Sequence, residues 1–126
     1  MANPSDTGNS GVGTETLRRS YVEGTGETEQ TVCTGVANHI ITIISTIICS
    51  VNGPSDSLFD FYIDRELSGT DIYLIYNQEI GAKGTFIFND KIILTDTDKL
   101  LFKSTSVSGT ASCNIWCNFI DQEFTT

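Results

Sequence analysis

The four cysteines are the first residues that could carry chemistry, as metal ligands or as disulfides. Cys113 and Cys117 lie four residues apart in a segment with the pattern of a strand. Such residues share one face of a strand but lie about 13 Å apart, beyond the reach of one disulfide or one metal ion. Cys33 and Cys49 lie in different predicted strands and could pair with either. Because nothing indicates secretion, we expect four free, largely buried thiols.

The carboxylates and the single histidine form no catalytic motif. Asp96 and Asp98 alternate in a Thr-Asp-Thr-Asp turn, which Asx-type hydrogen bonds explain without calcium, since no DxDxDG loop is present. His39 begins the longest apolar run, where a strand-edge histidine with a local hydrogen bond is expected. The sequence has no GxSxG, P-loop or GxGxxG motif in a suitable context. We therefore predict no catalytic residue, no metal, no cofactor and no enzymatic activity.

Exposed aromatic and basic residues are the candidates for protein contact. If Ile115 faces the core, alternation along the strand turns Trp116 outward or into an interface. An exposed aromatic residue on a strand more often marks a protein contact than a glycan contact. We expect Arg18, Arg19, Tyr21 and Trp116 to be contact residues. A sugar-stacking face is the alternative, and it would combine Trp116 with three tyrosines: Tyr62, Tyr73 and Tyr76.

Composition limits the classes of function. The chain has 126 residues, enough for one domain, and a formal net charge of −9. With so few basic residues it has no patch for nucleic acid or for an anionic membrane. The N-terminus lacks the pattern of a signal peptide. The apolar run Ile40–Val51 is too short for a membrane helix, and its β-branched residues favour a buried strand.

Short apolar runs separated by turn residues predict an all-β fold. We expect one antiparallel β-sandwich of about eight strands in residues 31–126, with almost no helix. Residues 1–30 are predicted to be an extended, partly disordered arm, in which the segment LRRSYV could form a short strand. The run from His39 to Val51 is apolar on both faces, which indicates a central strand or an interface. Ile43, Ile47 and Ile75 are the predicted core residues.

Turns are predicted at four places, all rich in turn-forming residues: Asn52–Ser55, Gly81–Gly84, Asn89-Asp90 and Thr95–Asp98.

The order of these motifs resembles that of small all-β virion proteins of tailed phages, especially marine and cyanobacterial phages. The matching segments are Thr31-Val32-Cys33-Thr34, Ile40–Val51, Asn52, Phe59–Ile63, Tyr73–Ile75, Gly81–Gly84, and Lys91–Leu94 with Asp98 and Leu100. The resemblance covers about two thirds of the chain. One departure is Gly35-Val36-Ala37-Asn38, where those proteins usually have a Pro-Ala-Gly turn.

This resemblance implies a structural protein of the virion, assembled in the host cytoplasm. It implies a homotrimer that contacts other virion proteins, either the major capsid protein or neck and tail proteins. The expected role is to decorate or cement the capsid through self-association and the N-terminal arm. The alternative is a neck, tail or fibre component that binds a glycan or receptor. No catalytic residues are implied.

Overall fold

The computed structural model of the chain describes residues 14–51, 57–65, 69–106 and 111–124. These residues form nine strands and no helix, so none of them belongs to a helix that could cross a membrane. The strands are β1 (Thr14–Val22), β2 (Gln30–Thr34), β3 (His39–Ser50), β4 (Ser57–Asp64), β5 (Asp71–Ile80), β6 (Thr85–Phe88), β7 (Ile92–Thr95), β8 (Lys99–Ser106) and β9 (Cys113–Glu123).

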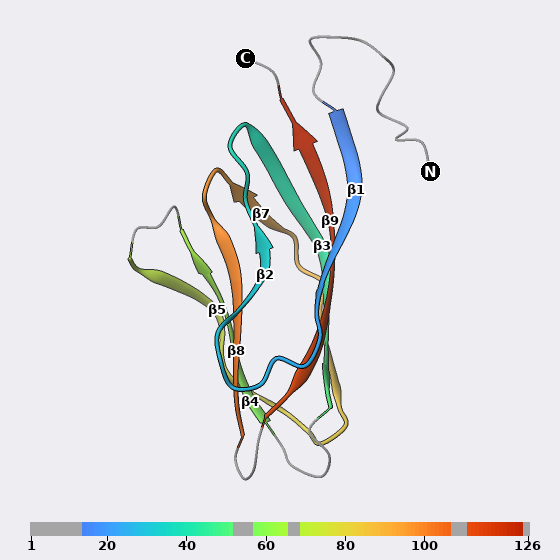
Figure 1. Ribbon diagram of the computed structural model, residues 1–126, viewed down its shortest axis with the longest axis vertical. Helices are drawn as coiled ribbons and strands as arrows, with labels where there is room; N and C mark the ends of the chain where they lie inside the picture. The colour runs from blue at the N-terminus through green and yellow to red at the C-terminus, as the bar shows by residue number, and fades with distance from the viewer. Residues whose placement is uncertain (1–13, 52–56, 66–68, 107–110, 125–126) are drawn as a thin grey trace.

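Two antiparallel sheets pack face to face (Figure 1). The larger sheet has the order β1-β9-β3-β6, with β7 also paired to β3, and the smaller sheet has the order β2-β8-β4-β5. β6 pairs with Thr46–Cys49 and β7 with Ile40–Ile43, so both occupy one strand position beside β3. With that position counted once, the arrangement is a jelly roll, an eight-position sandwich built from two Greek keys. The predicted all-β antiparallel sandwich is confirmed.

The hydrophobic core lies between the two sheets. Phe59 of β4 and Phe102 of β8 stack with ring centroids 5.5 Å apart, and Phe86 of β6 meets Phe59 edge-on at 5.2 Å. The opposite sheet contributes buried aliphatic and thiol side chains: Ile41, Ile43, Ile48, Ile115 and Cys117. Each fully buried large apolar side chain favours folding by about 1.5–3 kcal/mol.

An irregularity in β3 decides which of its isoleucines face inward. The pairing register of β3 with β9 shifts between Ile43 and Ser45. One extra residue in a strand moves every later side chain to the opposite face. Ile43 and Ile48 are therefore fully buried, whereas Ile47 is 37% exposed on the outer face. Of the three predicted core residues, Ile43 is confirmed, Ile47 is wrong, and Ile75 is half-buried against the core.

β1 is part of the larger sheet, although its residues fall within the segment predicted to be an arm. All nine of its residues pair with β9 in one unbroken register, from Thr14 opposite Glu123 to Val22 opposite Ile115. The inward positions of β1 include Arg18 and Ser20, which are polar. The sequence therefore lacks the alternation of apolar and polar residues that would predict a strand packed on the core. Its pairing with β9 supplies the order that its composition does not indicate.

Three of the four predicted turns lie within the described residues. Gly81–Gly84 joins β5 to β6, and the Gly84 amide donates to the Gly81 carbonyl at 2.8 Å. Thr95–Asp98 joins β7 to β8 with an Asp98 amide bond to the Thr95 carbonyl at 3.0 Å. Residues 89–90 separate β6 from β7. The turn predicted at Asn52–Ser55, and residues 1–13 of the predicted arm, lie outside the described residues.

Candidate functional site

The outer face of the larger sheet carries a row of exposed apolar side chains. Strand pairing places Tyr21 of β1 opposite Trp116 of β9, Trp116 opposite Ile47 of β3, and Ile47 opposite Ile87 of β6. All four side chains are more than a third exposed. Tyr21 and Trp116 were predicted to be contact residues, whereas Ile47 and Ile87 were not. Their membership depends on cross-strand register, which a single strand does not reveal.

A second apolar row runs parallel to the first, with a polar row between them. Leu17, Ile120, Thr42 and Ile93 lie opposite one another across β1, β9, β3 and β7. Leu17 and Ile93 are the most exposed of these, at 65% and 61%. The row between the two apolar rows consists of Arg19, Asn118 and Ser45. We call these three rows together the outer face.

Polar and aromatic neighbours hold Trp116 in place at the centre of the outer face. Its ring stacks on Tyr21 with centroids 5.9 Å apart, and the Arg19 guanidinium lies 5.2 Å from its centroid. The indole N–H donates to Asn118 Oδ1 at 3.0 Å, and Asn118 in turn donates to Ser45 Oγ at 3.1 Å. The ring is thus preorganised and its polar atom is satisfied. Beside it lies a groove of about 250 Å³, lined in part by Ile47 and Cys49.

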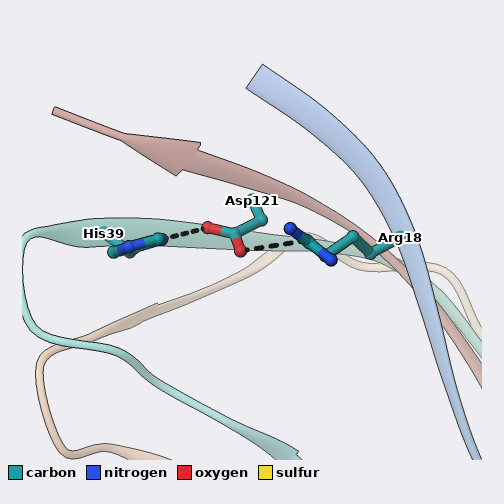
Figure 2. A network of polar contacts seen from close by, with 3 residues as sticks. All are labelled: Arg18, His39 and Asp121. Carbon is teal, nitrogen blue, oxygen red and sulfur yellow. Dashed lines mark hydrogen bonds and ion pairs between the residues drawn. The ribbon is translucent and has the colours of Figure 1, made fainter. Parts of the chain in front are cut away.

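Arg18 lies apart from the other predicted contact residues. Its Nε is 3.2 Å from Asp121 Oδ2, and His39 Nδ1 is 2.6 Å from the other carboxylate oxygen (Figure 2). Asp121 is 9% exposed and faces the inside of the sandwich. Arg18 therefore ties β1 to β9, and His39 ties β3 to the same carboxylate. The hydrogen bond of His39 is thus made to a neighbouring strand, not locally along the chain as the sequence suggested, and no cysteine shares an interaction with it in the contacts described.

The four cysteines form no disulfides in the structure, and three of them are buried. Cys33, Cys113 and Cys117 are buried, and Cys49 is half-buried. Burial raises the pKa of Cys33 to about 12 and that of Cys113 to about 11, which suppresses the nucleophilic thiolate near neutral pH. Within the described residues no group of three His, Cys, Asp or Glu side chains is placed to hold a metal ion.

A second exposed aromatic surface lies on the outer side of the smaller sheet. Tyr73 of β5 stacks on Tyr62 of β4 at 4.9 Å and meets Tyr76 edge-on at 5.2 Å. Tyr62 is buried, and its hydroxyl donates to Glu29 Oε2 at 2.5 Å. Tyr73 and Tyr76 are 46% and 67% exposed. Trp116 is on the other sheet, so the four aromatics proposed as one sugar-stacking face are divided between two surfaces.

Acidic side chains surround these tyrosines. Asp60 accepts a hydrogen bond from the Asn77 amide at 2.8 Å, and Asp64 lies directly opposite Asp71 in the pairing of β4 with β5. Asp64 Oδ1 is buried and has no hydrogen-bond partner. The pKa of the Tyr73 hydroxyl is raised, first by desolvation and then by the negative charges of Asp60 and Asp71. We call Tyr73, Tyr76, Asp60, Asp64 and Asp71 the tyrosine surface.

Glu27 closes the end of the sandwich next to β8. Its Oε1 accepts hydrogen bonds from the backbone amides of Ser106 at 2.9 Å and Ala111 at 3.3 Å. These two amides favour the charged carboxylate and lower the pKa of Glu27 below its ordinary value of 4.5. Glu27 thus binds the backbone on both sides of residues 107–110, at Ser106 and Ala111.

Comparison with known proteins shows the fold and leaves the family open. No protein-family model matches the sequence, and no curated protein matches it. A chain of the T13 viral particle of infectious bursal disease virus has a TM-score of 0.51 at 8% identity. That match covers 89% of this chain and 36% of the viral chain, so this chain spans about a third of it.

Two other similar structures come from proteins unrelated to virions. The core of Drosophila NLP, described in terms of pentamer formation and histone binding, has a TM-score of 0.48 at 9% identity, covering 88% of this chain and 99% of that one. The CBM22-1 xylan-binding domain of Paenibacillus barcinonensis Xyn10C has a TM-score of 0.46 at 13% identity, covering 90% and 74%. The likeness to the viral chain, at 8% identity, shows a β-sandwich fold alone.

Proposed function

We propose that the chain is a non-enzymatic structural protein of a virion that binds its neighbours through the outer face. The observation that carries the proposal is the pair of apolar rows across the larger sheet. The outward side of an antiparallel sheet is commonly polar because it faces water. Here large apolar side chains, Trp116 and Ile47 among them, occupy those positions instead. Exposed apolar side chains bordered by polar residues, as Arg19, Asn118 and Ser45 border these rows, mark a protein contact.

The charge distribution supports the same interpretation. Sixteen residues of the chain are acidic, yet Arg19 is the only charged residue in the three rows. Protein interfaces are depleted of charge at their centres and enriched in Trp, Tyr and Arg. Docking would remove one guanidinium per copy, that of Arg19, from water. An ion pair with one carboxylate on the neighbour would offset the free-energy cost of this desolvation.

Two independent likenesses favour a virion as the setting. The sequence motifs resemble small virion proteins of tailed phages, and the fold is similar to that of a viral particle chain with a TM-score of 0.51. Decoration or cementing of the capsid is the role we propose, with the N-terminal arm as a tether and a homotrimer as the assembled unit. The trimer comes from the resemblance to the phage proteins. The arm's role comes from its polar, Gly-rich composition, because ordering such a segment costs free energy that contacts on a neighbour would offset.

The glycan-binding alternative receives less support from the outer face. A sugar ring stacks on an open aromatic face, whereas Tyr21 and Arg19 contact the Trp116 ring. Its indole N–H, which would bind a hydroxyl, already donates to Asn118. The arrangement resembles a preorganised anchor for a protein contact.

The test uses virions of the virus that encodes the chain. Mass spectrometry of purified particles should find the chain in a fixed ratio to the major capsid protein. An electron-microscopy map should place the outer face against a neighbouring protein. A chain that is absent from virions, or an outer face open to solvent in the map, would overturn the proposal.

Variants sharpen this test. Particles lacking the chain are incubated with purified protein and sedimented. Ile47→Ser should reduce attachment at least tenfold, about 1.4 kcal/mol, because it removes an apolar contact at the centre of the outer face. Val36→Ser is the matched control, since Val36 is 43% exposed but lies in the loop between β2 and β3. Equal attachment of the two variants would argue against the outer face as the contact.

A further inference from the structure

The outer face and the tyrosine surface carry charges of opposite sign. The outer face has one cation, Arg19, and no carboxylate within its rows. The tyrosine surface has carboxylates around exposed aromatic rings, and Asp64 and Asp71 lie directly opposite each other. Like charges on facing residues destabilise a strand pair. A cation brought against these two carboxylates would relieve their repulsion.

Asp64 is the half-buried member of this pair and Asp71 the exposed one. Asp64 Oδ1 is shielded from solvent and accepts no hydrogen bond within the described residues. A buried carboxylate oxygen without a donor costs free energy. Two lysines of β8, Lys99 and Lys103, lie across from Asp64 and Asp60 in the sheet, on the side away from β5. No ion pair of theirs is among the salt bridges of the described residues, which leaves the β5 side of the carboxylates open for a guanidinium.

The shape of the molecule makes the tyrosine surface accessible to a neighbour. β5 is the last strand of the smaller sheet and pairs only with β4 among the described strands. In Figure 1 the end of β4 and the start of β5 extend away from the strands of the larger sheet. Two register shifts interrupt this pair, and Tyr73 and Tyr76 are exposed on it.

We propose that copies of the chain associate head to tail, with the outer face of one copy on the tyrosine surface of the next. Arg19 of the first copy lies against Asp71, the exposed member of the facing pair of carboxylates in the second, and the apolar rows cover Tyr73 and Tyr76. This inference rests on the outer face being a contact surface and names a second copy as its occupant. A contact between two different surfaces closes into a ring when its rotation permits and otherwise extends as a filament. Closure after three copies would give the homotrimer that the sequence resemblance implies.

Cation–π and ion-pair contacts account for the specificity of this pairing. Arg is the side chain suited to both, because its planar guanidinium stacks on aromatic rings and bonds carboxylates at two points. The alternative self-contacts are less favourable. Outer face against outer face brings two Arg19 residues together, and tyrosine surface against tyrosine surface adds further carboxylates to those already facing each other.

The experiment is analytical ultracentrifugation of the isolated full chain over a concentration series. The wild type should form a ring of identical copies as the concentration rises. Arg19→Glu and Asp71→Arg should each weaken association at least tenfold. The double variant R19E/D71R should recover it, because the two opposite charges then meet again with their positions exchanged. Both residues are exposed in the folded chain, so circular dichroism should show unchanged folding.

Matched controls apply the same charge changes in turns outside both surfaces. Lys83→Glu and Asp90→Arg are substitutions in such turns and should leave association unchanged. A wild type that stays monomeric at every concentration overturns the head-to-tail contact, as does a double variant that fails to recover. Either result leaves the proposed virion role standing if the chain is present in particles. A chain absent from virions that still forms the ring overturns the virion role alone.

Discussion

The two isoleucines on either side of the irregularity in β3 should differ sharply in their effect on stability. Replacing isoleucine with alanine removes three carbons, worth about 0.8 kcal/mol each when fully buried. Ile43 is fully buried, so the transfer contribution is about 2.4 kcal/mol, and the cavity left between the sheets raises the cost to about 3–4 kcal/mol. Ile47 is 37% exposed. Its cost should be about 1 kcal/mol, since water fills the space at an open surface.

Urea unfolding of Ile43→Ala and Ile47→Ala measures this difference, at concentrations low enough for single copies. The expected difference of about 2–3 kcal/mol corresponds to roughly 8–12 °C in the melting temperature of a domain of this size. Equal losses for the two variants would mean that the register shift between Ile43 and Ser45 does not reverse the faces of β3. The outer face would then lose one of its central residues.

Three further predictions concern other parts of the sandwich. At pH 8 an alkylating reagent should label Cys49 first in the folded chain, because the other three thiols are buried and their pKa values are raised. In the denatured, non-reduced protein the reagent should label all four cysteines, and fewer labels would reveal a disulfide. Gly35→Ala should destabilise the fold by about 1–3 kcal/mol in thermal melts, because an added Cβ would lie 2.7 Å from the Asp96 carbonyl oxygen. An unchanged melting temperature would show that the loop between β2 and β3 can shift to make room. Glu27→Gln should lower the melting temperature at pH 7. Because the pKa of Glu27 is lowered in the folded state, its charged carboxylate stabilises the fold above pH 4.5, and this stabilisation is lost as the pH falls through the folded-state pKa. The melting temperatures of the two proteins should therefore converge in acid. A difference in melting temperature that stays constant down to low pH would contradict this.

Much of the fold is readable from alternation along the strands. In β9 the sequence predicts Trp116 outward if Ile115 is inward, and the structure places them so, at 41% and 2% exposure. The central position of β3 follows from its two apolar faces and is confirmed by its pairing with β9, β6 and β7. These inferences succeed because each depends on side-chain direction within one strand.

The parts that sequence alone did not predict depend on relations between strands. The inner face of β1 carries Arg18 and Ser20, so its place in the sheet depends on pairing with β9 and on contacts such as the Ser20 hydroxyl bond to the Val32 carbonyl at 2.6 Å. The irregularity in β3 lies beside Ser45, in a segment that is otherwise β-branched from Ile40 to Ile48, and alternation along that segment does not reveal it. The outer face exists only once four strands are in register, which a reading of each strand separately does not supply.

Stability of a single copy does not explain why the outer face is apolar. Ile87 and Ile93 are 56% and 61% exposed, so they contribute little to the core that the inner faces already form. Threonine has the same β-branching and would suit these strands as well while facing water. A sequence whose local choices otherwise agree with its fold departs from that agreement where function requires it. The outer face gathers several such departures at positions that strand pairing places side by side, with Arg19 between them. The same chain exposes aromatic rings among carboxylates at the opposite sheet. In the proposed head-to-tail contact, these rings and carboxylates would meet the apolar rows and Arg19 of the next copy.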